Sequence, residues 1–382
     1  MRRGFIVYTL VAGATALASL SSVGCSLRIL DLTGSASIMS TAVLAYNAAF
    51  TIMSLVWHFT IGYRLSSRGL LTLSLATATV GVAMMAFSST PLIVLAGSGV
   101  VGLAVAIVSP VSISVLVEYT GRDSIAAAIY SFWAGVGGVL GYVSGVFISR
   151  SITSNVLELA TGLAAVLSVL AMFSPRVVVV LEHRRVSFLS TIPSGTGHLK
   201  PLPTVLFSHE LINEFWRIAR AFKKAFHKSI TRKAPLVLLT TLLFFTAVSL
   251  FFTPMPAFLR SIGVRDPVIY SLYTLLSVTS IATYKYIEKR KSSVESAWRI
   301  LVASLASRIA LFSLIMLAYR LPGEALMLFL TLEFILLGVT WGGASYSLIA
   351  VILSLSEKGR KSVRIGHQNV MTGAGMILGS LL

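Results

Sequence analysis

Apolar runs of membrane-spanning length dominate the chain. A bilayer core about 30 Å thick needs roughly 20 consecutive apolar residues per helical crossing. Such runs recur along the 382 residues, of which 56% are hydrophobic and only 12% are charged. A soluble domain of this composition would have a mostly apolar surface, so the surrounding solvent must be lipid. Charged and turn residues delimit eleven predicted spans, at 5–24, 36–61, 70–89, 91–117, 124–149, 155–174, 235–259, 267–287, 298–319, 324–354 and 365–382.

The loops between these spans differ sharply in charge. Placing the amino terminus in the cytoplasm puts 25 of the 31 Lys and Arg residues in cytoplasmic loops and five in outer loops. Cytoplasmic loops are enriched in Lys and Arg, so we expect a multi-pass protein of the cell membrane with a cytoplasmic amino terminus. Residues 5–23 resemble a cleavable signal, but similar segments follow, so we interpret them as the first span. The same topology accounts for the net charge of +18, and no nucleic-acid partner is expected.

Residues 175–234 form the one long polar stretch of the chain. Its prolines and glycines predict an irregular cytoplasmic linker between a six-helix bundle at 1–174 and a second bundle at 235–382. Within the linker, apolar residues recur every three or four positions with basic residues between them. We expect a helix that either lies on the inner membrane surface or is solvated as a charged linker. The apolar positions are Leu211, Phe215, Ile218, Phe222 and Phe226, and the basic ones are Arg217, Arg220, Lys223, Lys224 and Lys228.

A glycine-rich segment occurs twice, 238 residues apart. Gly121 and Arg122, just before the first copy, fall on Gly359 and Arg360 at the same offset. The offset also places residues 5–24 on the first span after the linker. Both copies are entered from the cytoplasm, so we predict a parallel repeat related by an axis along the membrane normal. The matching glycines are Gly135, Gly137 and Gly141 in the first copy and Gly373, Gly375 and Gly379 in the second.

The same offset projects the sixth span, 155–174, beyond Leu382, so the second bundle has five predicted helices. Either the sequence is shortened relative to an intact repeat, or the protein works with eleven spans. We favour the first alternative, because losing a helix leaves the packing faces of its neighbours against lipid.

The chain resembles the major facilitator superfamily. The best local matches are the block from Gly102 to Gly145, with Glu118 and Arg122 before its glycines, and the Phe251-Phe252-Thr253-Pro254 segment. Gly62 and Gly69 keep the spacing of the family's loop between helices two and three, but Ser66 and Ser67 stand where the family has Asp and Arg. Tyr142 also stands where the family has a proline after the glycine equivalent to Gly141. The resemblance implies two six-helix bundles joined by a cytoplasmic loop, with transport by alternating access.

Four glycines lie along one face of the fifth predicted helix, namely Gly135, Gly137, Gly141 and Gly145. Small residues at this spacing let a neighbouring helix approach closely. The contact is either a sliding surface between bundles, as the resemblance implies, or static packing.

Arg308 and Glu333 are the charges predicted deepest in the membrane. Each lies about ten residues, or ~15 Å, from the start of its helix, on adjacent antiparallel spans. Embedded charges cost roughly 2.5–3.5 kcal/mol on insertion scales and mark functional candidates. We expect either a structural ion pair between them or a substrate or proton site at Glu333.

The resemblance implies further residues on the cavity-lining helices, each of which has packing or an interfacial location as its alternative role. Pro254 and Pro256 are expected to break the seventh helix, either for gating or as a fixed kink. The candidate substrate-binding residues are Tyr8, Asn47, Tyr273, Glu333 and Trp341.

The sequence as a whole predicts a monomeric secondary transporter that moves a small organic solute by alternating access. A proton is a second candidate partner, and uniport stays open. The rival interpretation is a non-transporting or decayed membrane scaffold of the same fold. No nucleotide-binding motif and no cluster of His, Cys or carboxylates with catalytic or metal spacing is present. We therefore predict no enzyme activity, cofactor or metal.

Overall fold

The computed structural model describes residues 2–59, 65–120, 123–149, 153–175, 178–179, 233–289, 294–354 and 361–382. Gly62, Arg122 and the predicted basic amphipathic helix lie outside these residues. The described part is all-α apart from a two-residue antiparallel ladder, in which β1 (Leu65–Ser66) pairs with β2 (Val178–Val179). The ladder joins the loop after the second helix to the start of the linker.

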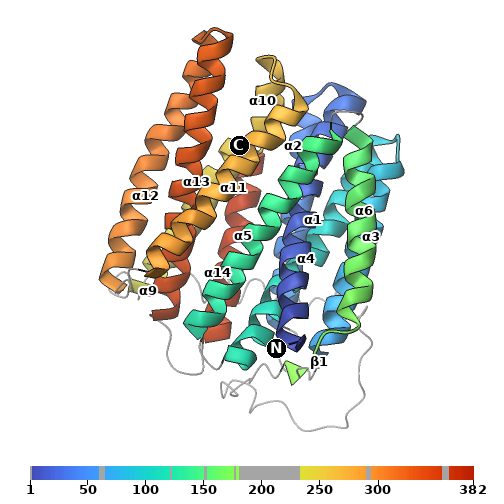
Figure 1. The fold of residues 1–382 in the computed structure, drawn as a ribbon, viewed down its shortest axis with the longest axis vertical. Coiled ribbons are helices and arrows are strands. Elements are labelled where there is room, and N and C mark those ends of the chain that lie inside the picture. The colour runs from blue at the N-terminus through green and yellow to red at the C-terminus, as the bar shows by residue number, and fades with distance from the viewer. Residues whose placement is uncertain are drawn as a thin grey trace, which may run out of the picture.

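Eleven long helices run roughly alongside one another in the described residues, if the broken pair α9 and α10 counts as one (Figure 1). By length and composition, eight spans could cross a bilayer unaided, whereas α6 is shorter and α11 and α14 are less apolar. The first half contains α1 (Arg2–Thr33), α2 (Ala36–Phe59), α3 (Ser67–Phe87), α4 (Pro91–Thr120), α5 (Asp123–Ile148) and α6 (Thr153–Ala171). The second half contains α9 (Lys233–Phe252), α10 (Met255–Ser261), α11 (Asp266–Lys289), α12 (Val294–Leu314) with the 3-10 turn η1 (Ile315–Arg320), α13 (Gly323–Ser354) and α14 (Lys361–Leu381).

The first helix is longer than the sequence pattern predicted, because α1 continues to Thr33 rather than ending near residue 24. Leu27 and Ile29, in the added part, are fully buried. The extra turns are therefore held by packing, which overrides the local charge of Arg28. Gly34, with a φ of 63°, follows the helix in the left-handed conformation that glycine adopts without strain.

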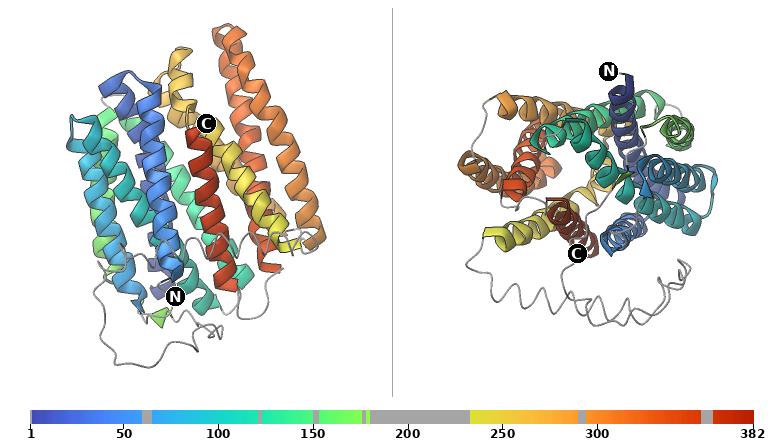
Figure 2. Two further views of the ribbon diagram at one scale, coloured as in Figure 1. Left: turned by 180° about the vertical axis from the view of Figure 1, so that it is seen from behind. Right: turned by 90° about the horizontal axis from the view of Figure 1, so that it is seen from below.

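The helices of the first half and those of the second form two groups that lie side by side (Figure 2). In the first half α1 contacts α4, α5 and α6, and α3 contacts α4 and α6. In the second half α9 contacts α14, α11 contacts α13, and α12 contacts α13. The halves meet where α5 lies against α11, where α2 lies against α14, and where α1 reaches α10.

The glycine repeat appears in these contacts as two equivalent helix crossings. A Cβ at Gly137 would collide with the carbonyl oxygen of Ala12 on α1, and a Cβ at Gly375 would collide with that of Leu242 on α9. One turn later, a Cβ at Gly141 would lie 2.5 Å from the Ala16 oxygen, and one at Gly379 would meet the Thr246 oxygen. The predicted repeat is thus present in the structure.

The register of the repeat differs from the single offset of 238 that the sequence suggested. That offset holds for α5 and α14, but the contacts align Ala12 with Leu242 and Ala16 with Thr246, an offset of 230. Thr51 on α2 contacts Gly373, and Ile281 on α11 contacts the equivalent Gly135. Thr51 and Ile281 are also 230 residues apart. The second half therefore has eight more residues between its second and fifth helices, which a single offset could not represent.

The described helices of the second half include no counterpart of α6. In the first half, α6 covers α1, with Leu157 against Gly24 and Leu167 against Gly13. Leu243 on α9, the equivalent of Gly13, has 60% of its surface exposed. The face that α6 covers in the first half is therefore open on α9 in the second.

The glycine contacts predict a clear effect on stability. We expect Gly141→Ala to lower the midpoint of thermal unfolding in detergent, because the new methyl group would meet the Ala16 oxygen and the Ser19 Cβ, 3.0 Å away. Gly162→Ala, on α6, is the matched control, because nothing lies within 4 Å of its Cβ position. That change should raise the midpoint, since alanine favours a helix interior by about 0.5–1 kcal/mol over glycine. An equal response of the two variants would contradict the close contact.

Candidate translocation site

The two halves touch through side chains on α5 and α11 at one crossing and on α2 and α14 at the other. Gly135 and Gly145 on α5 face Ile281 and Tyr270 on α11, so both glycines lie between the halves. Gly137 and Gly141 instead contact α1 within the first half. The four predicted glycines therefore divide into two that join the halves and two that hold the first half together.

The crossing of α2 and α14 carries a cluster of uncharged polar groups. Asn47, which is 3% exposed, donates from Nδ2 to the Ser380 hydroxyl at 2.9 Å and to the Met376 carbonyl at 3.4 Å. Ser249 on α9 donates to the same carbonyl at 2.9 Å. The Ser249 hydroxyl also lies 3.0 Å from that of Ser380 and 3.2 Å from that of Thr253. Asn47 is thus the member of this polar cluster that belongs to the first half.

The other crossing is mainly aromatic. Tyr273 on α11 is 7% exposed, and its ring lies 5.4 Å from the ring of Tyr142 on α5, across the boundary between the halves. Within the second half, the same ring lies 5.5 Å from Phe334 and 6.1 Å from Phe252. Tyr273, predicted from the sequence, therefore lies where the halves meet.

Arg308 and Glu333 do not form the ion pair that we considered from the sequence. Arg308 is 2% exposed and donates from Nη2 to the Leu337 carbonyl at 3.0 Å, while its Nε and Nη1 have no hydrogen-bond partner. Glu333 is 3% exposed, and its Oε1 also has no partner. Leu337 lies one turn after Glu333 on α13, so the guanidinium is held by that backbone carbonyl instead of the carboxyl group. Helix spacing predicted the depth of both groups but not the orientation of their side chains.

Aromatic rings surround the Arg308 guanidinium. Its central carbon lies 5.2 Å from the ring centre of Trp341, 5.4 Å from Phe244 and 5.5 Å from Phe312. Cation–π contacts stabilise a desolvated guanidinium by about 2 kcal/mol or more. The predicted residue Trp341 therefore contacts the embedded charge directly.

The position equivalent to Glu333 in the first half is a glycine. The contacts of Gly102 with Tyr46 and of Gly338 with Leu276 align α4 with α13 at an offset of 236, which places Glu333 on Gly97. A Cβ at Gly81 would lie 2.8 Å from the Gly97 oxygen, so these two glycines let α3 and α4 touch.

The remaining predicted residues lie apart from these clusters. Tyr8 stacks on Trp133 within the first half, with ring centres 5.6 Å apart. Glu118 is exposed near the end of α4, and Gly69 is exposed with nothing within 4 Å of its Cβ position. Pro254 and Pro256 lie where α9 ends at Phe252 and α10 begins at Met255, so the expected helix break is present.

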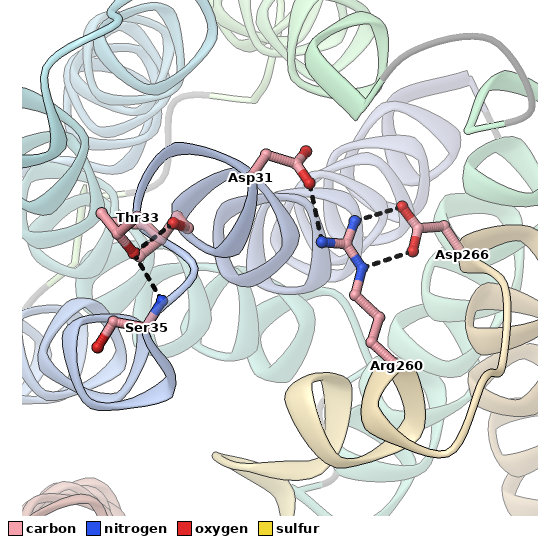
Figure 3. Close-up of polar contacts among 6 residues, drawn as sticks. Asp31, Thr33, Ser35, Arg260 and Asp266 are labelled. Atoms are coloured by element: carbon pink, nitrogen blue, oxygen red, sulfur yellow. Dashed lines mark hydrogen bonds and ion pairs between the residues drawn. The ribbon is translucent and has the colours of Figure 1, made fainter.

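An arginine joins the halves at the end of the molecule away from the amino terminus (Figure 3). Arg260 on α10 binds Asp266 of its own half through two bonds, from Nε at 2.8 Å and from Nη2 at 2.6 Å. Its Nη1 donates to Asp31 on α1 at 2.8 Å. The bidentate contact fixes the guanidinium to the second half, and the single contact reaches the first.

Sequence reasoning missed Arg260, Asp31, Ser249 and Ser380. Opposite charges six residues apart were visible at Arg260 and Asp266, but nothing indicated Asp31, which is 229 residues away from Arg260. Ser249 is the repeat of Ser19 at an offset of 230. The glycine repeat in the sequence gives an offset of 238, so it did not reveal this match. No group of three or more His, Cys, Asp or Glu residues suited to a metal occurs within the described ranges.

Comparison with known proteins places this geometry in a family. A family model described as Major Facilitator Superfamily matches residues 5–380. The crystal structure of the nucleoside transporter NupG is similar over 100% of this chain and 90% of that chain, with a TM-score of 0.68 and 15% identity. The crystal structure of a D-xylose-proton symporter is similar over 99% and 89%, with a TM-score of 0.65 and 11% identity. Comparison with curated proteins gives no significant match. The resemblance predicted from the glycine segments is confirmed: this multi-pass membrane protein belongs to the Major Facilitator Superfamily of transporters.

Proposed function

We propose that the protein is a secondary transporter that moves a small organic solute across the cell membrane by alternating access. The observation that carries the proposal is the pair of equivalent crossings, α5 on α11 and α2 on α14, through which two internally rigid halves meet. Such a pair lets the halves rock against each other about an axis parallel to the membrane plane, opening each side in turn while each half keeps its own packing. A nucleoside transporter and a D-xylose-proton symporter share the fold, which supports an organic solute.

We infer that the halves are closed against each other on the outer side. The charge distribution of the loops favours a cytoplasmic amino terminus, and with that orientation Thr33 at the far end of α1 lies on the outer side. The Arg260–Asp31 ion pair then joins the halves on the outer side. The contacts of Tyr270, Tyr273 and Ser277 on α11 continue from that end to the middle of the membrane.

Glu333 and Arg308 are the groups proposed to couple transport to protons. Both are buried, neither is paired with the other, and the carboxyl oxygen Oε1 has no hydrogen-bond partner. A buried carboxyl group without a partner favours its neutral, protonated form. The first half has Gly97 at the position equivalent to Glu333, so the fold itself does not require this carboxyl group. Loss of the proton would favour movement of the Arg308 guanidinium from the Leu337 carbonyl to Glu333.

Flux measurements on Glu333→Gln test this coupling. In proteoliposomes with D-xylose and the nucleoside uridine as probes, we expect the native chain to accumulate a transported probe when an inward proton gradient is imposed. The amide mimics the protonated acid but cannot release a proton, so Glu333→Gln should lose gradient-driven accumulation and keep exchange of labelled for unlabelled probe. Glu324→Gln, on the exposed first turn of the same helix, should behave as the native chain.

Accumulation by Glu333→Gln at the native level would remove Glu333 from the coupling role. Absence of both accumulation and exchange in the native chain, for every probe, would favour the non-transporting scaffold instead.

The Asp31–Arg260 pair predicts a shift in the conformational equilibrium. We expect Asp31→Asn to favour opening of the outer side, because Arg260 keeps its two bonds to Asp266 but loses its charged partner in the first half. The side chains are 25% and 35% exposed, so the pair contributes at most about 1 kcal/mol, or about fivefold in population. The reporter is Ser277→Cys, between the halves, in a Cys25→Ser background. Its labelling by a membrane-impermeant maleimide should become up to about fivefold faster.

Glu295→Gln is the control, because it removes the exposed pair between Arg299 and Glu295, which lies within α12. The labelling rate should not change in that variant. An unchanged rate in Asp31→Asn would show that this ion pair does not hold the halves together.

A further inference from the structure

The polar cluster at the crossing of α2 and α14 has chemistry that identifies a class of solute. It contains the Asn47 amide, the hydroxyls of Ser249, Thr253 and Ser380, and the Met376 carbonyl. All of these groups are uncharged. The embedded charge of Arg308 contacts the rings of Phe244, Phe312 and Trp341 and donates a hydrogen bond to the Leu337 carbonyl, not to the cluster.

Asn47 depends on the opposite half for both of its side-chain bonds. Nδ2 donates to Ser380 and to the Met376 carbonyl, and both of these residues are on α14. When α2 separates from α14, as alternating access requires, the two N–H donors of Asn47 lose their acceptors. Unpaired buried donors are costly, so in the separated state these two N–H groups bind water or a solute that replaces the lost acceptors.

The second half supplies the acceptors for Asn47, namely the Met376 carbonyl and the Ser380 hydroxyl. Separation leaves the Met376 carbonyl and the Ser380 hydroxyl without their donor from Asn47, although Ser249 and Ser380 still donate to the carbonyl. A solute hydroxyl can accept a hydrogen bond from Asn47 and donate one to the carbonyl or the serine oxygen. A carboxylate could replace only the acceptors, and an ammonium group could replace only the donor.

The equivalent crossing of α5 and α11 shows that helix packing does not require this cluster. There Ser277 stands in the place of Asn47, and Gly138 stands in the place of Met376. The Ser277 hydroxyl lies 3.5 Å and the Ser19 hydroxyl 3.7 Å from the Cβ position of Gly138. The glycine contacts are common to both crossings, whereas the asparagine occurs in one. A role in packing alone therefore does not explain Asn47.

We infer that Asn47, Ser249 and Ser380 form the hydrogen-bonding part of the solute site, and that the solute is an uncharged molecule with hydroxyl groups. The inference rests on the proposed transport function and adds the class of solute to it. Asn47 supplies the donors from the first half, and Met376 and Ser380 supply the acceptors from the second.

Binding and exchange on the full chain test the inference. The probes are D-xylose and uridine as uncharged hydroxylated solutes, benzoate as an organic anion, and choline as an organic cation. We expect at least one uncharged probe, and neither ion, to raise the unfolding midpoint of the native chain in detergent and to exchange in proteoliposomes.

Two variants on opposite sides of the cluster separate binding from folding. Asn47→Ala and Ser380→Ala should each weaken binding of the uncharged probe about tenfold, which corresponds to about 1.4 kcal/mol. Ser277→Ala, at the position equivalent to Asn47, is the matched control and should bind within about twofold of the native chain. The unfolding midpoint without solute shows whether each variant is folded.

Native-like binding by both variants would overturn the assignment of these residues. Binding of benzoate or choline in preference to the uncharged probes would overturn the class of solute and leave transport intact. Failure of every uncharged probe to bind or exchange would also overturn the proposed class of solute. Transport itself would fail only if no probe of any class were exchanged.

Discussion

The fold depends on backbone contact between helices at glycine residues. Within a bilayer, lipid is as apolar as a leucine side chain, so helices associate through close packing and hydrogen bonds rather than by escape from water. Gly137 and Gly141 allow α5 to rest on the carbonyl oxygens of α1, and Gly375 and Gly379 allow α14 to rest on those of α9. Each half is therefore built around one pair of helices that are too close to accept a side chain between them.

This contact also separates the rigid parts of the protein from those that can move. Toward its own half, each glycine helix meets backbone atoms, which cannot change position without disturbing the partner helix. Toward the other half, the same helices meet side chains, with Gly135 against Ile281, Gly145 against Tyr270 and Gly373 against Thr51. Side chains can change rotamer and slide past one another. The chemistry of the contacts thus allows the halves to rotate against each other as intact bodies.

Features set by composition and local pattern could be predicted from the sequence. Contacts that depend on the position of a side chain in three dimensions could not. Apolar length predicted the spans, and the glycine repeat predicted how α5 and α14 pack. The sequence could not predict that packing extends α1 to Thr33, because Leu27 and Ile29 are buried by distant helices. It placed Arg308 and Glu333 at similar depths, but which group the guanidinium contacts depends on rotamers and on the Leu337 carbonyl. Asp31 and Arg260 meet only because the two halves do.

The internal repeat distinguishes residues that the fold requires in both halves from residues that occur in only one half. Both halves need the helix contacts that hold a bundle together. A residue that differs between equivalent positions of the two halves is therefore not needed for that packing. Glu333 stands where the first half has Gly97, whose contact with Gly81 already suffices to join two helices. Asn47 stands where the second half has Ser277, and Arg260 where the first half has Leu30. Buried charges and amides are costly in a membrane, and the equivalent glycine and serine show that packing can be achieved without Glu333 and Asn47. These asymmetric positions are therefore where a transport function must be sought.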